Sequence, residues 1–255
     1  MGSWTFEELP GGLSSLADKN TARLLEKWDL AANSQAARFR YSAPFEAGEL
    51  DAFVTAFFNS NTVQAAAPVR AGTRRSSAAW VQLGRVDAVE CERLSTTVVR
   101  RDIFDRLEER GIVRGGSIAR CMDVPCGEMV IASDLLRLML LDEGSEEWAT
   151  YSDGERRELI FHLFRILAVG GGLNQWEDDI APYIDMTTAL YKDMVAVHKD
   201  ARGSLAVRSV VLRVLSVEGS APLFPSPSSH HRCLLAIDPL LRHVTLFYHA
   251  FYPMM

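Results

Sequence analysis

Apolar residues recur with the spacing of an α-helix in six segments of the chain. The clearest is 48–58, whose apolar residues fall on one helical face. They are Leu50, Phe53, Val54, Phe57 and Phe58. The three phenylalanines either belong to the core or form an aromatic docking face. Further helices are predicted at 18–31, 99–110, 133–141, 153–169 and 180–198. In 153–169 the apolar residues lie nearly all round, which predicts a central buried helix.

Residues 205–217 are rich in valine and alternate between apolar and polar, which predicts a strand. Residues 36–42 alternate weakly, and they and the short segments 80–83, 86–91 and 117–124 are also predicted to be strands. The strongest pattern is a terminal hairpin. Its predicted strands, 232–237 and 243–251, flank the residues 238–242, where Pro239 favours a tight turn. We therefore predict one α+β domain over 1–255, with helices packed on a mainly antiparallel sheet and a C-terminal β-hairpin.

Two segments show neither the apolar spacing of a helix nor the alternation of a strand. Residues 59–79 are rich in alanine, serine and arginine, which predicts a mobile loop that folding does not require. Residues 220–229 are predicted to form a second, Pro/Ser-rich loop. The glycines 170–172 follow a predicted helix, and no Lys-Ser or Lys-Thr pair comes after them. They are therefore interpreted as a helix end and not as a phosphate-binding loop.

Composition and charge narrow the classes of partner. The 255 residues carry a net charge of −6, so non-specific attraction to nucleic acid is not expected. The longest apolar stretch, 159–173, is interrupted by His162, Arg165 and the glycine run, which argues against a membrane-spanning helix. We therefore do not expect the protein to have a membrane as its partner. Four cysteines without a signal peptide favour a reducing compartment.

No residue pattern indicates a catalytic, cofactor or metal site. The spacing of Cys121 and Cys126 differs from that of zinc knuckles. The acidic residues 177–179 either hold a divalent cation or favour the N-terminus of the next helix, and the second interpretation needs no ligand. His243 and His249 share one strand face without a local partner. We therefore predict that the chain is not an enzyme and has no catalytic, cofactor-binding or metal-ligating residues.

Four groups of segments carry a likeness to a known family. They are 51–58 with Asn61; 121–126 with 133–137; 158–195, including Gln-Trp-Glu-Asp at 175–178 and Leu-Tyr-Lys-Asp-Met-Val at 190–195; and 238–243 with Tyr248 and His249. In this order they resemble the cilia- and flagella-associated protein 300 family across nearly the whole chain. The departures lie mainly in 59–79 and 220–229, where loops tolerate change.

The resemblance implies a biological process and not a chemistry. Members of that family are implicated in assembling outer and inner dynein arms, are linked to preassembly factors and intraflagellar transport, and occur in the cytoplasm and the cilium. The resemblance therefore implies a non-catalytic adaptor or assembly factor. Its expected partners are dynein-arm subunits, their preassembly factors and the intraflagellar transport machinery. A stable structural component of the axoneme is the alternative hypothesis, and an undetected enzyme is a third.

One segment is the predicted protein-interaction site. The candidate residues are Gln175, Trp176, Glu177, Asp178, Lys192 and Asp193. A tryptophan among polar residues after a glycine run is of the type that anchors interfaces. The surface is expected to continue onto the polar face of the helix 180–198. Alternatively, Trp176 fills the core beneath the loop, and the sequence leaves both interpretations open.

Overall fold

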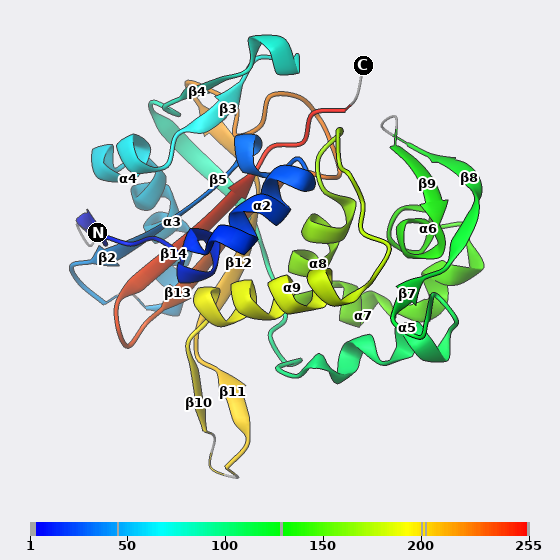
Figure 1. Cartoon of the computed structure of the whole chain (residues 1–255). Coiled ribbons are helices and arrows are strands. Elements are labelled where there is room, and N and C mark those ends of the chain that lie inside the picture. The colour runs from blue at the N-terminus through cyan, green and yellow to red at the C-terminus, as the bar shows by residue number, and fades with distance from the viewer. Residues whose placement is uncertain (1–3, 45, 128–129, 200, 202, 254–255) are drawn as a thin grey trace.

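A six-stranded antiparallel sheet forms the centre of the computed structural model, which describes residues 4–44, 46–127, 130–199, 201 and 203–253 (Figure 1). Its strands follow the order β1-β2-β14-β13-β12-β5. Their bounds are Phe6–Glu8 (β1), Ser34–Tyr41 (β2), His243–His249 (β14), Arg232–Asp238 (β13), Val210–Gly219 (β12) and Val86–Arg93 (β5). This arrangement confirms the predicted α+β class with a mainly antiparallel sheet.

The predicted hairpin, β13 and β14, lies in the middle of this sheet. Ile237 is opposite Val244 in its register, and β14 also pairs with β2. The Asp238 carboxylate closes the turn by accepting the amide of Leu240 at 2.9 Å, and Arg242 takes a left-handed backbone angle of φ 54°. Every residue of β13 is buried, because helices cover both faces of the sheet.

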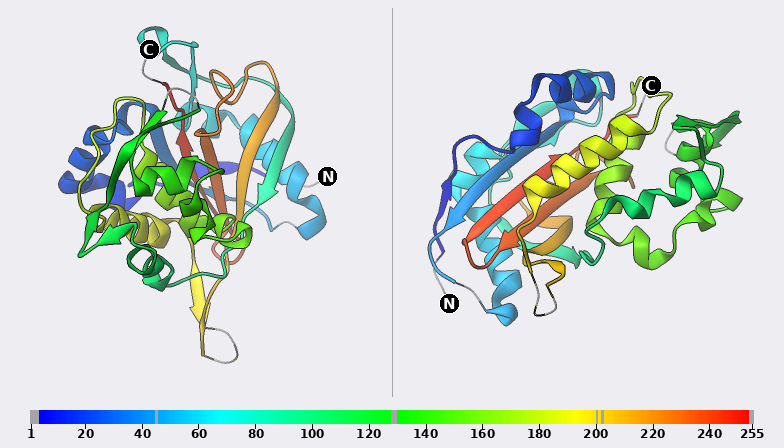
Figure 2. Two further views of the ribbon diagram at one scale, coloured as in Figure 1. Left: turned by 90° about the vertical axis from the view of Figure 1, so that its right-hand side faces the viewer. Right: turned by 60° about the horizontal axis from the view of Figure 1, so that its bottom comes forward.

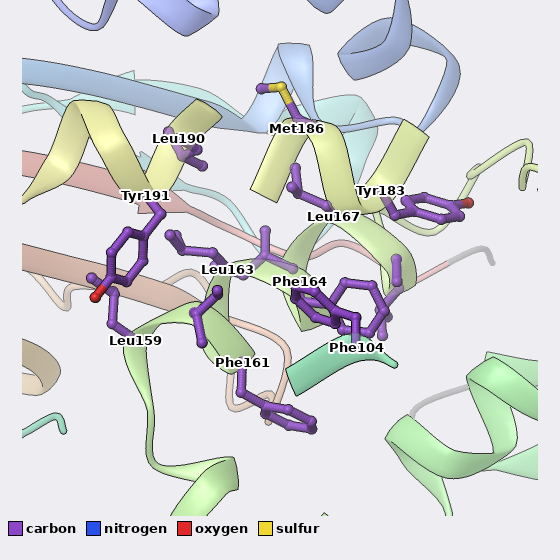
Figure 3. Close-up of a cluster of buried hydrophobic side chains, with 14 of the residues drawn as sticks. Phe104, Leu159, Phe161, Leu163, Phe164, Leu167, Tyr183, Met186, Leu190 and Tyr191 are labelled. Atoms are coloured by element: carbon purple, nitrogen blue, oxygen red, sulfur yellow. The ribbon is translucent and has the colours of Figure 1, made fainter. Parts of the chain in front are cut away.

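One face of the sheet is covered by α8 (Leu159–Val169), α9 (Ala181–Met194) and α2 (Lys19–Lys27), and α6 (Leu135–Leu141) packs against α8 in the same cluster. Figure 3 shows the side chains of α8 and α9 interlocking, with Phe164 against Phe104. The sheet contributes Leu234, Ala236 and Phe247 to this cluster. Ten of the eleven residues of α8 are buried, which confirms the predicted central helix.

The opposite face carries α3 (Leu50–Asn59) and α4 (Asn61–Ala66), so the sheet lies between two sets of helices (Figure 2). Phe53, Phe57 and Phe58 are all buried there. Phe57 meets the edge of Phe39 from β2, with ring centroids 5.3 Å apart. The core interpretation of these phenylalanines is therefore confirmed, and the docking-face alternative is wrong.

The loop predicted at 59–79 is wrong, because this segment contains α4, β3 (Val69–Ala71) and a short 3-10 helix, Arg75–Ser77. Val63 and Val69 are buried in the second cluster. β3 pairs with β4 (Ala79–Val81), and the Arg75 guanidinium binds both carboxylate oxygens of Asp29. Two well-placed valines and one ion pair anchor a segment whose small residues hide its periodicity.

Several predicted elements are divided or shortened in the structure. The helix 153–169 splits into α7 (Asp153–Arg156) and α8, because Glu158 is buried between them and accepts hydrogen bonds from Ser95 Oγ at 2.6 Å and Val98 N at 3.3 Å. The helix 180–198 ends at Met194. The strand 205–217 becomes β12 and β11 (Leu205–Val207), which pairs with β10 (Val197–Lys199) in a hairpin that projects from the body (Figure 1).

The remaining elements are short helices, 3-10 turns and two-stranded hairpins outside the central sheet. The predicted helix 99–110 is a 3-10 turn, Arg101–Phe104, followed by α5 (Arg106–Glu109). The predicted strand 117–124 is divided between β7 (Ser117–Ile118) and β8 (Arg120–Cys126). β7 pairs with β6 (Val113–Arg114), and β8 pairs with β9 (Val130–Asp134). α1 spans Ser14–Ala17, and further 3-10 turns span Ala31–Asn33, Ala47–Glu49 and Glu146–Thr150. Residues 220–229 hold neither helix nor strand, as predicted.

Candidate protein-interaction site

The segment between α8 and α9 is held tightly against the end of α2. The amides of Gly171 and Gln175 donate to the carbonyls of Trp28 and Lys27, both at 2.9 Å. Gly170 has φ 67°, and a Cβ added there would lie 2.6 Å from the Trp28 carbonyl. The first glycine of the run is therefore required by both the backbone angle and this close approach. α8 ends at this point, as the interpretation of the glycine run predicted.

Glu177 faces the protein interior and not a partner. Its carboxylate accepts Lys27 Nζ at 2.7 Å and Trp28 Nε1 at 2.9 Å, and its own amide donates to Tyr183 Oη at 3.0 Å. Trp28 is fully buried, so this carboxylate satisfies a polar group that would otherwise lack a partner in the core. Glu177 therefore positions the segment 175–178 on α2 and α9.

Trp176 is half-buried and stacks on a buried cation. The Arg137 guanidinium lies 4.9 Å from its ring centroid and 5.0 Å from that of Tyr183. Arg137, on α6, is 0% exposed; it forms an ion pair with Asp134 at 3.0 Å and donates to the Ala168 carbonyl at 3.1 Å. Trp176 Nε1 is buried, and no described residue forms a hydrogen bond with it. Sequence reasoning missed Arg137, although an arginine inside the run Leu-Leu-Arg-Leu-Met-Leu-Leu is itself a signal of a buried polar contact.

A groove of about 380 Å³ lies beside Trp176 and is called the β9 groove below. It runs between β9 and the loop that joins α8 to α9, which lie side by side (Figure 1). Its lining residues are Asp123, Val130, Ile131, Ser133, Val169, Gly171, Gly172, Leu173, Asn174, Trp176 and Phe251. Two apolar side chains there remain open to solvent, Ile131 with 49% and Leu173 with 50% of their surface exposed.

The two edges of the β8–β9 hairpin differ in their capacity to pair. β8 and β9 form a sheet of two strands, in which Pro125 is opposite Ile131. Because proline has no N–H, this pair is of the type without hydrogen bonds, and the main-chain groups of Ile131 point away from β8. Pro125 likewise blocks the outer edge of β8. β9 therefore presents a pairing edge on the side of Ile131.

The six predicted interaction residues do not form one surface. Gln175 and Asp178 are exposed, and Asp178 forms an ion pair with Arg120 of β8. Lys192 and Asp193 lie at the other end of α9, whose 14 residues span about 21 Å. Asp193 instead accepts the hydroxyl of Ser14 at 2.8 Å. The predicted continuation of the interaction surface along α9 therefore stays a prediction, and it would require a partner that spans the length of this helix.

The cysteines and buried histidines lack the features of activated catalytic groups. Burial raises the pKa of the Cys91 thiol to about 11, and burial likewise raises the pKa of the Cys233 thiol, whereas a nucleophilic cysteine needs a lowered pKa. Burial lowers the pKa of His162 to about 2 and that of His249 to about 3, so both are neutral. Among the described residues, no three His, Cys, Asp or Glu side chains are grouped as metal ligands. In the same part of the chain, no helix is both long and apolar enough to cross a membrane.

These features define a mixed α+β protein whose antiparallel sheet is covered by helices on both faces and which has an apolar groove beside Trp176. The model of the family "Cilia- and flagella-associated protein 300" matches residues 3–249. A relative of that name from Chlamydomonas reinhardtii is 36% identical over 248 residues, covering 94% of this chain and 95% of the relative. Another from Paramecium tetraurelia is 28% identical over 235 residues, covering 91% and 87%. No solved structure matches the chain. The chain belongs to the cilia- and flagella-associated protein 300 family.

Proposed function

We propose that this protein is a non-catalytic adaptor needed for the assembly and intraflagellar delivery of outer and inner dynein arms. Membership of a cilia- and flagella-associated family supports the ciliary setting. The unactivated thiols and neutral buried histidines favour a binding role over a chemical one. Cytoplasm and cilium are the compartments that such a role requires, because arms assembled in one must be delivered to the other.

The observation that carries the binding role is the β9 groove. An extended peptide placed against β9 would pair with the outward N–H and C=O of Ile131, as in strand addition to an open sheet edge. Its apolar side chains would cover Ile131 and Leu173, and a carbonyl could accept Trp176 Nε1 after a small shift of the ring. The proposed occupant is an extended apolar segment of a dynein-arm subunit or preassembly factor.

The test uses the double variant Ile131→Glu, Leu173→Glu in cells that lack the protein. Both side chains are about half exposed, so the variant is expected to fold, whereas two charges in the groove should prevent an apolar segment from binding. We expect normal accumulation, cilia of near-normal length, and missing dynein arms by electron microscopy. Leu241→Glu is the matched control, since this leucine is 55% exposed and lies outside the β9 groove; it should restore the arms.

Two results would contradict the proposal at different levels. If the double variant folds and restores all arms, the β9 groove is not the functional surface. If cells without the protein keep all their arms, the role in arm assembly is wrong. Salt extraction of isolated axonemes tests the alternative, because an adaptor should be found in the soluble matrix, whereas a structural component of the axoneme should resist extraction.

A further inference from the structure

A second pocket, of about 260 Å³, is unusually rich in arginine. It lies where α7 and the start of α8 approach β5 and β12, and is called the arginine pocket below. Its lining residues are Arg156, Arg157, Arg165, Arg213, His162, Glu92, Asp153, Trp148 and Phe161. Because the chain as a whole has a net charge of −6, this concentration of guanidinium groups is a local feature and not a consequence of composition.

The positive charges of the arginine pocket exceed the negative ones. Four arginines are opposed by two carboxylates, Glu92 and Asp153. Glu92 approaches Arg213 only at 3.5 Å. Among the described residues, no carboxylate lies within 4.0 Å of the Arg157 guanidinium, which is exposed. Arg157 therefore brings to the pocket a positive charge that no carboxylate of the described residues pairs with.

Arg156 forms a preorganised wall of this pocket. Its guanidinium stacks 3.5 Å from the centroid of Trp148 and donates to the carbonyls of Trp148 at 2.6 Å and Tyr151 at 3.3 Å. These contacts hold the plane of the guanidinium in one orientation. A fixed arginine loses little conformational freedom when an anion binds, which favours recognition over diffuse attraction.

His162 supplies an unused polar group at the same place. It is 7% exposed, and its Nδ1 has no hydrogen-bond partner among the residues that the structure describes. Burial, followed by the charges of Arg232, Arg213 and Arg165, lowers the pKa of this imidazole to about 2, so the ring is neutral and the surrounding field is positive. A buried polar atom without a partner costs free energy unless a ligand or water satisfies it.

We propose that the arginine pocket binds a phosphate group. Guanidinium groups match the oxygens of phosphate in geometry and charge, and a neutral imidazole can add an N–H donor. The pocket is small and the rest of the chain acidic, which favours one localised dianion over a nucleic-acid backbone. The group is carried either by free phosphate or by a phosphorylated serine of a partner.

The experiment titrates the full chain with inorganic phosphate, a phosphoserine peptide and the same peptide unphosphorylated, at constant ionic strength. The readout is the NMR shift of arginine Nε–H and histidine ring signals. We expect saturable shifts at Arg157 and His162 with both phosphate-bearing probes and none with the unphosphorylated peptide. Arg157→Gln should weaken the apparent Kd roughly tenfold or more, because a charged hydrogen-bond donor is lost. Arg23→Gln is the matched control, since Arg23 is exposed on α2 and outside the pocket.

Each outcome decides the proposal. Tighter binding of the phosphopeptide than of inorganic phosphate supports a partner-borne group, and equal binding supports free phosphate. The absence of saturable shifts with either probe, or an equal loss in Arg23→Gln and Arg157→Gln, overturns the site. The Ile131→Glu, Leu173→Glu variant should bind both probes normally, so failure of the β9 groove and failure of the arginine pocket are distinguishable. Thermal unfolding of each variant verifies that it is folded.

Discussion

Replacing Arg137 by leucine should destabilise the protein severely. The guanidinium is fully buried, and its loss removes one partner from each of three groups. Asp134 loses the ion pair at 3.0 Å, the Ala168 carbonyl loses a donor at 3.1 Å, and Tyr183 Oη loses a donor as well. Removing one member of a buried pair typically costs about 3–5 kcal/mol, because the other charge remains in the interior. The loss of two further hydrogen bonds places Arg137→Leu at the upper end of that range.

The assay is urea unfolding followed by tryptophan fluorescence and circular dichroism. Domains are stable by only about 5–15 kcal/mol, so this loss would remove a large part of the total and lower the Tm by roughly 6–20 °C. The unfolding midpoint should fall while the slope against urea stays constant. Arg101→Leu is the control, because Arg101 forms an exposed pair with Asp185 and should cost less than about 1 kcal/mol.

A second substitution isolates the charge. In the double variant Arg137→Leu, Asp134→Asn, no carboxylate is left unpaired at this place. The side-chain oxygen of the asparagine can still accept a hydrogen bond from the backbone amide of residue 137, which caps the start of α6. The double variant should therefore be more stable than the sum of the single changes predicts. If Arg137→Leu costs less than about 1 kcal/mol, or if the two changes simply add, the buried ion pair does not have the role inferred from the structure.

Three further predictions follow from the sheet and its surroundings. A chain ending at Ala236 lacks β14, which pairs on both sides in the sheet, and should show no cooperative unfolding by circular dichroism. Replacing 64–76 by a short linker should lower the free energy of unfolding by at least about 3 kcal/mol in urea, because buried Val69 and three side-chain hydrogen bonds of Gln64 are lost. An unchanged unfolding midpoint would restore the loop interpretation. Burial raises the pKa of Asp238, but hydrogen bonds from Arg208 and from two backbone amides lower it by more. The net effect is a folded-state pKa below the usual value of an aspartate. The stability advantage of wild type over Asp238→Asn should thus be complete above about pH 4 and disappear as the pH falls through the lower folded-state pKa. An advantage that did not shrink as the solution was acidified would contradict this linkage.

Elements with strong local periodicity were predictable from the sequence. α3, α8 and the β13–β14 hairpin each carry several large apolar residues at one period, so local pattern and burial agree. The helix and strands of the segment 59–79 were not predictable, because its alanines and serines give no periodic pattern and its valines are the large apolar side chains that enter the core. The break before α8 depends on Glu158 reaching Ser95, which is distant in sequence. No local pattern reports such a contact.

The candidate site shows the same division. The sequence indicated Trp176 from its position after the glycines, and the structure places it beside the β9 groove. It could not indicate that Glu177 binds Lys27, since 150 residues separate them. Nor could it show that α9 separates Lys192 from Trp176. Single residues at a site were thus visible, whereas their grouping required the tertiary structure.

The position of the hairpin has a consequence for synthesis of the protein. β13 and β14 are translated after every other described strand, yet they lie between β2 and β12 in the sheet. Until they leave the ribosome, β1 and β2 have no neighbour on one side, and the phenylalanines of α3 have no complete sheet to cover them. Such long-range pairing folds slowly and exposes apolar surface meanwhile. The nascent chain should therefore depend on chaperones to protect it until its last strands arrive.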